Sequence, residues 1–333
     1  MTAGDSSLTG IQFAVTSAAL DGDTSAVYHL VTELFGEGMP FEGVLFDVIA
    51  PVQRSLGERW VSGDYLISEE HVATNTIETV VSLLGGSFEQ PDDAPRIVIS
   101  CVEGEEHTLP GRMLSAHLLS DGFRTVHLGA SMPATDLQRY LTEDPPDALV
   151  LTCTMTINLP GARKSIAAGH AAGVPVIIGG PAFGDGGERA ARLGADAWVP
   201  ALRDVAPLLR SWQPRPSAAA AAASSPATEL EPLMASRPVV VATAASMLGG
   251  GPEKSALHQE PVELAFDALA AALTADEDQL LHDFAGWMAD FDTARDEEGP
   301  SPARILSALR QAIDEEYEDS RSRLAAAIEQ LNA

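Results

Sequence analysis

The sequence predicts an α/β domain between two all-helical units, and three patterns along the chain predict it. Apolar residues recur at helical steps up to about residue 88, short β-branched runs alternate with helical stretches as far as residue 213, and helical spacing returns after residue 237. A chain of 333 residues is long enough for more than one hydrophobic core. We therefore expect a helical bundle in residues 1–88, an α/β domain in 89–213, a linker in 214–237 and a helical domain in 238–333.

The N-terminal unit is expected to be a four-helix bundle that covers the next domain as a cap. Within residues 8–86, apolar side chains recur at helical steps, as along the stretch from Ile49 to Trp60. The breaks between the helices contain glycine and polar residues: Asp21–Asp23, Gly36–Gly38 and Ser62–Asp64. Four helices joined by such short connections are typical of an antiparallel bundle.

The central unit alternates short apolar runs with helical spacing, which is typical of a parallel sheet covered on both faces. Five runs have the length and composition of strands: Ile97–Val102, Thr125–Leu128, Ala148–Cys153, Val174–Ile178 and Ala197–Val199. The expected fold is therefore a Rossmann-like (flavodoxin-like) domain with a five-stranded parallel sheet. Such folds bind ligands beyond the carboxyl ends of their strands, so the loops there are the place to look for a site.

The composition excludes several kinds of partner. The formal net charge is −28, and a field of that sign repels the phosphate backbone of nucleic acids. The chain has no run of about 18 apolar residues to span a membrane. Its N-terminal residues lack the pattern of a signal peptide, so we expect a cytoplasmic protein.

The two cysteines, Cys101 and Cys153, lie in apolar runs and are expected to be buried, without a disulfide or a thiolate metal site.

The loop after the first predicted strand contains a histidine with an acidic residue two positions before it. His107 lies where this fold binds ligands, and the Glu105 carboxylate can hold one nitrogen of its ring. A ring held in this way has a fixed tautomer and is a better metal ligand. The alternative is a solvated loop histidine beside acidic residues. Small residues at the other strand ends favour a ligand slot: Gly129, Thr152, Cys153, Thr154, Gly179 and Gly180.

This arrangement resembles the cobalamin-binding domains over roughly residues 96–200. In that family a D/E-x-H-x-x-G motif supplies the lower axial cobalt ligand, and a short S-x-L/T stretch and a Gly-Gly pair accommodate the displaced nucleotide tail. The resemblance implies that His107 binds cobalt and that Glu105 supports it. It also implies cofactor contacts from Gly111, Leu128, Gly129, Thr152, Cys153, Thr154, Gly179 and Gly180, with Thr152 and the glycine pair lining the tail pocket. Pro110 departs from the motif, which has glycine there, although proline suits the first turn of a helix.

The N-terminal bundle carries a second resemblance. Ser68 is a good N-cap, which places Glu70 and His71 in the first turn of the fourth helix. The spacing from Trp60 to this Glu-His pair resembles the cap of the CarH-type adenosylcobalamin photoreceptors, in which these residues surround the 5′-deoxyadenosyl group. The alternative is that Trp60 is a core anchor and Glu70 interacts with the helix dipole. Two features depart from that family. Those proteins begin with a basic helix-turn-helix whereas the sequence here starts at the bundle, so direct DNA repression is not expected, and Val61 stands where they have a histidine.

The C-terminal unit resembles that of the photocobilin type of light sensor, which joins a cobalamin domain to a helical domain that holds biliverdin. The resemblance rests on domain order and on the pattern Leu280–Trp287. It implies a non-covalently bound bilin, because the unit has no cysteine, with His258 and His282 as its histidine contacts. The alternative is that His282 flanks a core face and that the unit is a bundle for dimerisation or for docking a partner.

Together these resemblances imply a light sensor and not an enzyme. We expect adenosylcobalamin to bind with His107 in place of its nucleotide base, and photolysis of the cobalt–carbon bond to change the domain or oligomer arrangement. Biliverdin is expected as a second chromophore. The expected protein partner is a second copy of the chain or a downstream effector, and neither nucleic acid nor a membrane is expected to bind directly.

The alternative function is that of a corrinoid carrier protein for methyl transfer. Such a carrier needs an open upper face for its methyltransferase, and the bulky Trp60 argues against one. An adenosylcobalamin mutase would need a substrate barrel of about 250 residues, for which the chain has no room. A receiver-like domain would have an acidic phosphoacceptor after its first strand, where this chain has the loop with His107.

Overall fold

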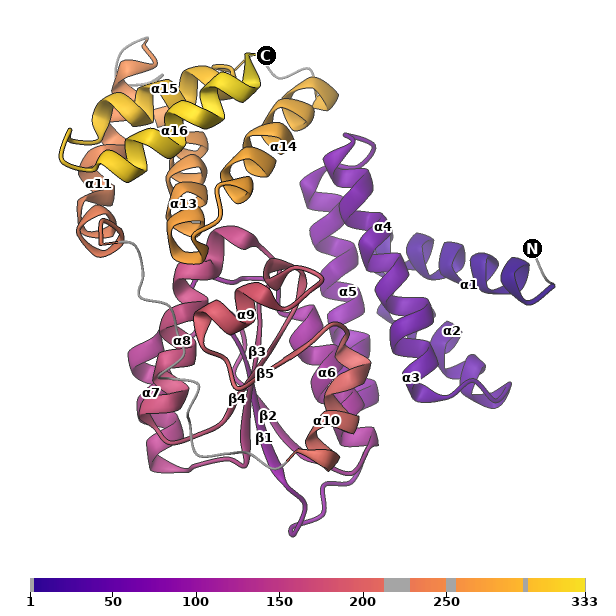
Figure 1. Ribbon diagram of the computed structural model, residues 1–333. Coiled ribbons are helices and arrows are strands. Elements are labelled where there is room, and N and C mark those ends of the chain that lie inside the picture. The colour runs from indigo at the N-terminus through magenta and orange to yellow at the C-terminus, as the bar shows by residue number, and fades with distance from the viewer. Residues whose placement is uncertain (1–2, 213–227, 250–255, 296–298, 333) are drawn as a thin grey trace.

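The structure is a computed structural model that describes residues 3–212, 228–249, 256–295 and 299–332. Figure 1 shows three units: the N-terminal helices lie beside a sheet domain, and the C-terminal helices lie above the sheet in this view. Within the described ranges, no helix is both long and apolar enough to cross a membrane.

The N-terminal unit, here called the cap, is the expected bundle of four helices. Its elements are α1 (Ala3–Leu20), α2 (Thr24–Gly36), α3 (Phe41–Gly43), η1 (Val44–Ile49), α4 (Ala50–Val61) and α5 (Ile67–Gly85). Because α3, η1 and α4 follow one another without a break, they form one helix with a wider π-helical part in the middle. Pro51 has no N–H to donate to the Asp47 carbonyl one turn earlier, and the Gln12 side chain donates to that carbonyl instead, at 2.8 Å.

The fourth cap helix begins earlier than predicted. Helix α5 starts at Ile67, and Leu66 is its N-cap residue. The Glu69 carboxylate accepts a hydrogen bond from the Leu66 N–H at 2.7 Å and so satisfies the exposed helix end. The prediction that Ser68 caps this helix is therefore wrong, because a carboxylate three positions into the helix serves instead. Glu70 remains in the first turn, and His71 follows it.

The five predicted strands form one parallel sheet. They are β1 (Arg96–Cys101), β2 (Arg124–His127), β3 (Ala148–Thr152), β4 (Val176–Gly179) and β5 (Ala197–Val199), in the order β2-β1-β3-β4-β5. This is the flavodoxin-like order, in which the winding reverses between β1 and β3. In the register of that pair Cys101 lies opposite Thr152. The loops that carry Glu105 and Thr154 therefore leave the sheet side by side.

Helices cover both faces of the sheet. Helices α7 (Ala134–Glu143), α8 (Leu159–Ala171) and α9 (Glu188–Leu193) pack on one face, and α6 (Leu109–Ser120) and α10 (Val205–Ser211) pack on the other. Successive strand residues enter opposite layers: Val98 joins the first core and Ile99 the second. Short turns η2 (Thr156–Asn158), η3 (Pro181–Phe183) and η4 (Leu202–Asp204) follow β3, β4 and β5.

Several contacts attach the cap to the sheet domain, and two of them involve Gly85 and Arg203. At Gly85 of α5, a Cβ atom would lie 2.9 Å from the Cβ of Ala116 on α6, so glycine allows the two helices to approach closely. At the other place, Arg203 of η4 lies 3.0 Å from the Asp47 carboxylate, and its guanidinium lies 5.3 Å from the centroid of the Phe46 ring. Phe46 and Asp47 both belong to η1.

The C-terminal unit begins inside the predicted linker. Its helices are α11 (Leu230–Met247), α13 (Gln259–Ala275), α14 (Gln279–Arg295), α15 (Pro302–Ala312) and α16 (Glu318–Leu331). The predicted linker, 214–237, therefore extends too far, since Leu230 and Leu233 are buried in the core of this unit. Pro232 is compatible with the helix because it lies in the first turn, where its missing N–H is not needed. Residues 213–227 lie outside the described residues.

The C-terminal unit packs on the loops at the carboxyl end of the sheet. Helix α13 contacts η2, α8 and α9, and its core is continuous with the core on the α7–α8 face of the sheet. An ion pair adds to this contact: Arg189 of α9 donates two hydrogen bonds, of 2.9 and 2.7 Å, to the Glu277 carboxylate. The C-terminal helices thus lie over the edge where this fold binds ligands.

Candidate functional site

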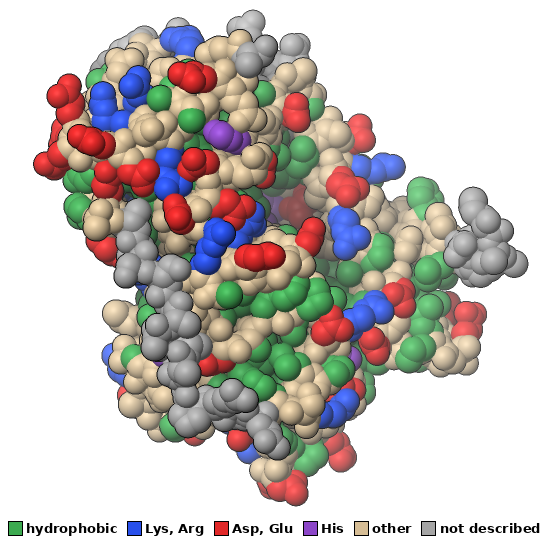
Figure 2. Space-filling view, in the orientation of Figure 1, with side chains coloured by type: hydrophobic (Ala, Val, Ile, Leu, Met, Phe, Trp, Pro, Cys, Tyr) green, Lys and Arg blue, Asp and Glu red, His purple; other side chains and the backbone are tan. Residues whose placement is uncertain are grey.

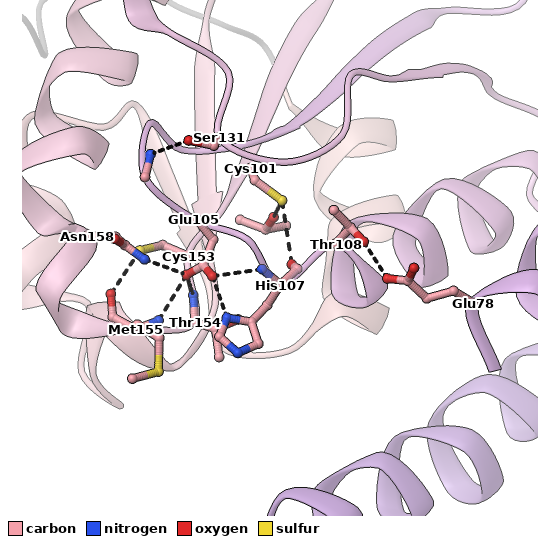
Figure 3. A network of polar contacts seen from close by, with 12 residues as sticks. Glu78, Cys101, Glu105, His107, Thr108, Ser131, Cys153, Thr154, Met155 and Asn158 are labelled. Carbon is pink, nitrogen blue, oxygen red and sulfur yellow. Dashed lines mark hydrogen bonds and ion pairs between the residues drawn. The ribbon is translucent and has the colours of Figure 1, made fainter. Parts of the chain in front are cut away.

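A buried carboxylate organises the loop after β1. Glu105 is 0% exposed and accepts hydrogen bonds from the backbone N–H groups of His107, Thr154 and Met155, at 3.0, 2.6 and 3.0 Å, and from the Asn158 amide at 3.2 Å (Figure 3). Burial alone would raise the pKa of Glu105, but the hydrogen bonds from His107 and Met155 outweigh it and lower the pKa to about 2. The charged carboxylate therefore joins the loop after β1 to the loop after β3.

The same carboxylate holds the histidine ring. His107 Nδ1 lies 2.5 Å from Glu105 Oε1, while the side chain of His107 is 55% exposed. The hydrogen bond to Glu105 raises the pKa of His107 against the effect of burial. Because the carboxylate accepts from Nδ1, a neutral ring keeps its lone pair on Nε2. Figure 3 shows Nε2 at the far end of the ring, turned away from Glu105.

Two further contacts fix the histidine loop. The Ser131 N–H, after β2, donates to the Glu105 carbonyl at 2.8 Å, and the Ser131 hydroxyl accepts from the Gly104 N–H at 3.1 Å. On the other side, the Thr108 hydroxyl donates to the Glu78 carboxylate of α5. The loop is thus connected to the β2 loop and to the cap as well as to the β3 loop, which restricts the positions open to the His107 ring.

A cavity of about 530 Å³ lies between the cap and the ends of β3, β4 and β5. Five residues that the sequence assigns to the cofactor line it: Thr152, Cys153, Thr154, Gly179 and Gly180. The cap and the segment from β5 to η4 supply further lining residues, including Phe46, Arg54, Trp198 and Arg203. Figure 2 shows that the molecular surface is also hollowed where the three units meet. The structure therefore brings the predicted strand-end residues together around one space.

Of the two glycines at the end of β4, Gly180 is required by a close backbone contact. Gly180 has a φ of 119°, and a Cβ atom on it would lie 2.2 Å from the Cys153 carbonyl oxygen. At Gly179 a Cβ would lie 3.1 Å from the Val199 side chain. Any side chain at Gly180 would therefore collide with the neighbouring loop and alter the cavity wall.

Three other residues assigned to the cofactor lie on the β2 and α6 side. Leu128 donates its N–H to the Ile99 carbonyl at 2.8 Å, and the Gly129 carbonyl accepts from the Cys101 N–H at 3.2 Å, so both extend the pairing of β2 with β1. Gly111 is buried in α6, and a Cβ on it would lie 2.5 Å from Nε2 of His127. In this structure Gly111 accommodates the His127 ring.

His127 should make the fold sensitive to acid. Burial, with a smaller effect of Arg112, lowers the pKa of His127 from 6.5 to about 4, and its buried Nε2 has no partner among the described residues. The folded protein holds the His127 ring in its neutral form. The protein therefore has its full stability above pH 6.5 and loses stability as the pH falls towards 4, because the unfolded chain binds a proton there more readily. The shift corresponds to about 3 kcal/mol.

Urea denaturation of wild type and His127→Phe between pH 7 and 4 measures this effect. The wild type should lose more stability over the interval than the variant, and His29→Phe, on the exposed side of α2, should behave like wild type. Equal pH dependence in wild type and His127→Phe would contradict the assignment.

The predicted cap residues have different surroundings. The Glu70 carboxylate accepts hydrogen bonds from Gln53 at 3.1 Å and from Thr74 at 2.6 Å, and its side chain is 16% exposed. The hydrogen bond to Glu105 is the main cause of the raised pKa of His107, and the negative charge of Glu70 raises this pKa further. Glu70 therefore acts on the His107 ring across the space between the cap and the loop. The His71 side chain is 71% exposed, with Nε2 3.8 Å from the Glu70 carboxylate.

Trp60 contacts the C-terminal unit. Its ring centroid lies 5.5 Å from that of Phe291 on α14, and the Phe291 ring lies 5.3 Å from that of Trp287. Figure 1 shows the C-terminal end of α14 close to the end of the cap. The cap and the C-terminal unit therefore share an aromatic contact, which the sequence pattern did not predict.

The two histidines considered for a bilin lie on different helices. His258 is the N-cap residue of α13, and His282 lies in the first turn of α14. The Nε2 atom of His282 is buried and has no partner within the described ranges. Neither histidine lines the 530 Å³ cavity.

The donor set limits how a metal could be held. In the part of the chain that the structure describes, no group of three or more His, Cys, Asp or Glu side chains could bind a metal ion. A metal bound by His107 would therefore take its other ligands from outside this set of side chains, as a corrin ring would supply them. Cys101 and Cys153 are both buried, and burial raises the pKa of the Cys101 thiol to about 11, so neither is a ready thiolate ligand.

Comparison with known proteins adds to this geometry. Residues 95–205 match a family described as a B12 binding domain, and residues 12–84 match a second family with the same description. The chain is 30% identical over 141 residues to the HTH-type transcriptional repressor CarH of Myxococcus xanthus, and the match covers 41% of this chain and 46% of the repressor. It thus spans less than half of that protein's length.

A solved structure is similar in fold. The monomethylamine corrinoid protein of Methanosarcina barkeri aligns with a TM-score of 0.50 and 16% identity, over 59% of this chain and 94% of that one. At this identity the likeness concerns the fold alone. Together with the two family matches, it identifies the sheet domain and bundle as a Rossmann-like B12-binding domain with a helical cap, and supports cobalamin as the cofactor.

Proposed function

From the premise of a B12-binding domain with a helical cap, we propose that this chain is a cytoplasmic light receptor that binds adenosylcobalamin with its nucleotide base displaced by His107. One observation carries the proposal: the buried Glu105 carboxylate holds Nδ1 of His107 and leaves Nε2 available to cobalt. The resemblance of the cap to CarH-type photoreceptors and the partial identity with CarH support the adenosyl form.

The chain's own residues fit such a cofactor. When bound, adenosylcobalamin supplies a cobalt–carbon bond that green light breaks. His107 would lie on the lower side of the ring, and the cavity bordered by Thr152 and the Gly179–Gly180 pair would receive the displaced nucleotide tail. Trp60, Glu70 and His71 would enclose the upper side, as the CarH resemblance implies.

The contacts of the C-terminal unit suit it for output. Helix α14 reaches Trp60 of the cap through Phe291, and α13 packs on η2, in which Asn158 donates to Glu105. The unit thus contacts Trp60, which is assigned to the upper side of the cofactor, and the turn whose Asn158 holds Glu105. A change of packing on either side would alter its position, which supports a light-dependent change in domain or oligomer arrangement.

Biliverdin in the C-terminal unit is part of this proposal. The buried and unpartnered Nε2 of His282 is the feature that supports it among the described residues. Adding biliverdin to the purified protein should give a red-shifted absorbance band that His282→Ala weakens. Absence of such a band in the wild type would remove the bilin from the proposal.

A corrinoid carrier for methyl transfer is the second candidate. The fold of the monomethylamine corrinoid protein is compatible with it. A carrier must open the upper side of its corrinoid to a methyltransferase, whereas here Trp60 packs against α14 of the same chain. This contact favours the receptor.

Illumination tests the proposed function. Protein reconstituted with adenosylcobalamin in darkness should change its visible spectrum under green light and change its sedimentation coefficient at the same time. Phe291→Ala should photolyse as the wild type does. The coupling between photolysis and the change in sedimentation coefficient should be about 2- to 10-fold weaker, which is the usual effect of losing an aromatic pair. The exposed Phe13→Ala, at 76% exposure, is the matched control.

The outcomes separate the two candidate functions. Photolysis with no change in sedimentation or in contacts between the units would contradict a receptor. Methyl transfer from bound methylcobalamin to a thiol, at the same rate in darkness and light, would favour the carrier.

A further inference from the structure

Among the cations whose side chains the structure describes, one is not paired. The chain has 48 aspartates and glutamates against 20 lysines and arginines. Among the lysines and arginines that the structure describes, Arg54 alone takes part in no hydrogen bond, ion pair or cation–π contact. Arg54 is exposed, so it loses little by having no carboxylate partner, and its guanidinium is available to a ligand.

The position of Arg54 suggests what kind of ligand it binds. Arg54 lies on α4 and lines the 530 Å³ cavity together with Thr152 and the Gly179–Gly180 pair. At one end of the cavity lie the buried strand ends, where Thr152 is 2% exposed. At the other end lies the exposed guanidinium of Arg54. A positive group placed there can meet an anionic part of whatever enters the cavity.

The other charged groups of the cavity do not neutralise Arg54. Arg203 lines the same cavity, but it lies 3.0 Å from the Asp47 carboxylate and 3.9 Å from Glu42, so its charge is already compensated. Asp185 also lines the cavity and forms no ion pair with Arg54. The charge of Arg54 is thus the one that remains available to an anion.

A second unpaired donor belongs to a residue of the same cavity wall. The indole Nε1 of Trp198 is buried and has no hydrogen-bond partner in the described part of the chain. A buried donor without an acceptor costs about 1–3 kcal/mol in general, so an acceptor-bearing occupant or a water would relieve it. Both unsatisfied groups are donors, which indicates an occupant that carries acceptors.

We propose that Arg54 binds the phosphodiester of the displaced nucleotide tail of cobalamin. The inference rests on the proposed function, since it assumes that the cavity receives this tail. A guanidinium offers paired N–H donors that match the oxygens of a phosphate, and such charge-assisted hydrogen bonds are among the strongest in proteins. The cap would then select corrinoids that carry a complete tail, in addition to covering the upper face.

Cobinamide, a corrinoid without the nucleotide and its phosphate, provides the test. The affinities of the full chain for hydroxocobalamin and for cobinamide are measured by absorbance titration in darkness, for wild type and for Arg54→Gln. The variant should bind cobalamin about 10-fold more weakly or worse and should bind cobinamide as wild type does. Arg54→Lys, which keeps the charge, should recover part of the loss.

Arg59→Gln is the matched control. Arg59 lies on the same helix, but its guanidinium contacts Tyr65 and it does not line this cavity. This variant should bind both corrinoids as wild type does. Equal affinities of wild type and Arg54→Gln for cobalamin, or equal losses for the two corrinoids, would overturn the assignment of Arg54 and leave the proposed function intact. A wild type that binds neither corrinoid would refute the proposed function and this inference with it.

Discussion

Glu105→Ala should both unfold the binding loop and abolish corrinoid binding. The substitution would leave the N–H groups of His107, Thr154 and Met155 without their acceptor in a fully buried position. Removing one partner from a buried, charged hydrogen-bond network usually costs about 3–5 kcal/mol of stability. Urea denaturation of the cofactor-free protein measures this loss.

The neighbouring Glu106 provides the control for this prediction. It is exposed, so Glu106→Ala should change the free energy of unfolding by less than about 0.5 kcal/mol. Glu105→Gln keeps the shape of the side chain but not its charge, and it should weaken corrinoid binding about 10- to 100-fold with a smaller loss of stability. Equal stability of Glu105→Ala and Glu106→Ala would show that the loop does not depend on the carboxylate.

His107→Ala should remove binding without unfolding the domain. The His107 side chain is 55% exposed, so its loss should change the free energy of unfolding by no more than about 1 kcal/mol. The bound spectrum should lose the features of an imidazole ligand, and the affinity for corrinoids should fall by more than about 100-fold, because loss of a metal ligand exceeds loss of its supporting partner.

His71→Ala is the matched control for the ligand assignment. It removes an exposed histidine near the same space, on the cap side, and should leave the lower ligand in place. If His107→Ala bound cobalamin with the wild-type spectrum, His107 would not be the cobalt ligand.

The fold was predictable where the sequence pattern has a direct physical cause. The central strands β1, β3 and β4 are buried and largely apolar, which made them easy to locate. The edge strand β5 at Ala197–Val199 matches the prediction residue for residue. Helix ends are less certain because several side chains can satisfy the same N–H groups. Ser68 is a good capping residue, yet Glu69 serves this end of α5 from inside the helix.

The candidate site was only partly predictable. The pair formed by Glu105 and His107 follows from local spacing, and the structure confirms their contact at 2.5 Å. Asn158, which donates to the same carboxylate, lies 53 positions from Glu105 along the chain, and no local pattern indicates it. The position of Asn158 shortly after β3 is the signal that could have drawn attention to it.

Contacts between units could not be inferred from the sequence. The contact of Trp60 with Phe291 depends on how the cap and the C-terminal unit pack on the sheet domain, and neither residue has a pattern that specifies the other. The same holds for Arg54, whose lack of a partner becomes visible only when all the described cations have been placed.

One spectrum can show whether a nitrogen of the protein binds cobalt, as proposed for His107. Protein labelled with ¹⁵N-histidine is loaded with unlabelled cob(II)alamin and examined by electron paramagnetic resonance. If a protein histidine is the axial ligand, the ¹⁴N triplet on each cobalt line becomes a ¹⁵N doublet, and His107→Ala removes the doublet. A triplet that persists in the labelled wild type would show that the cofactor's own base still holds the metal, which would contradict the account.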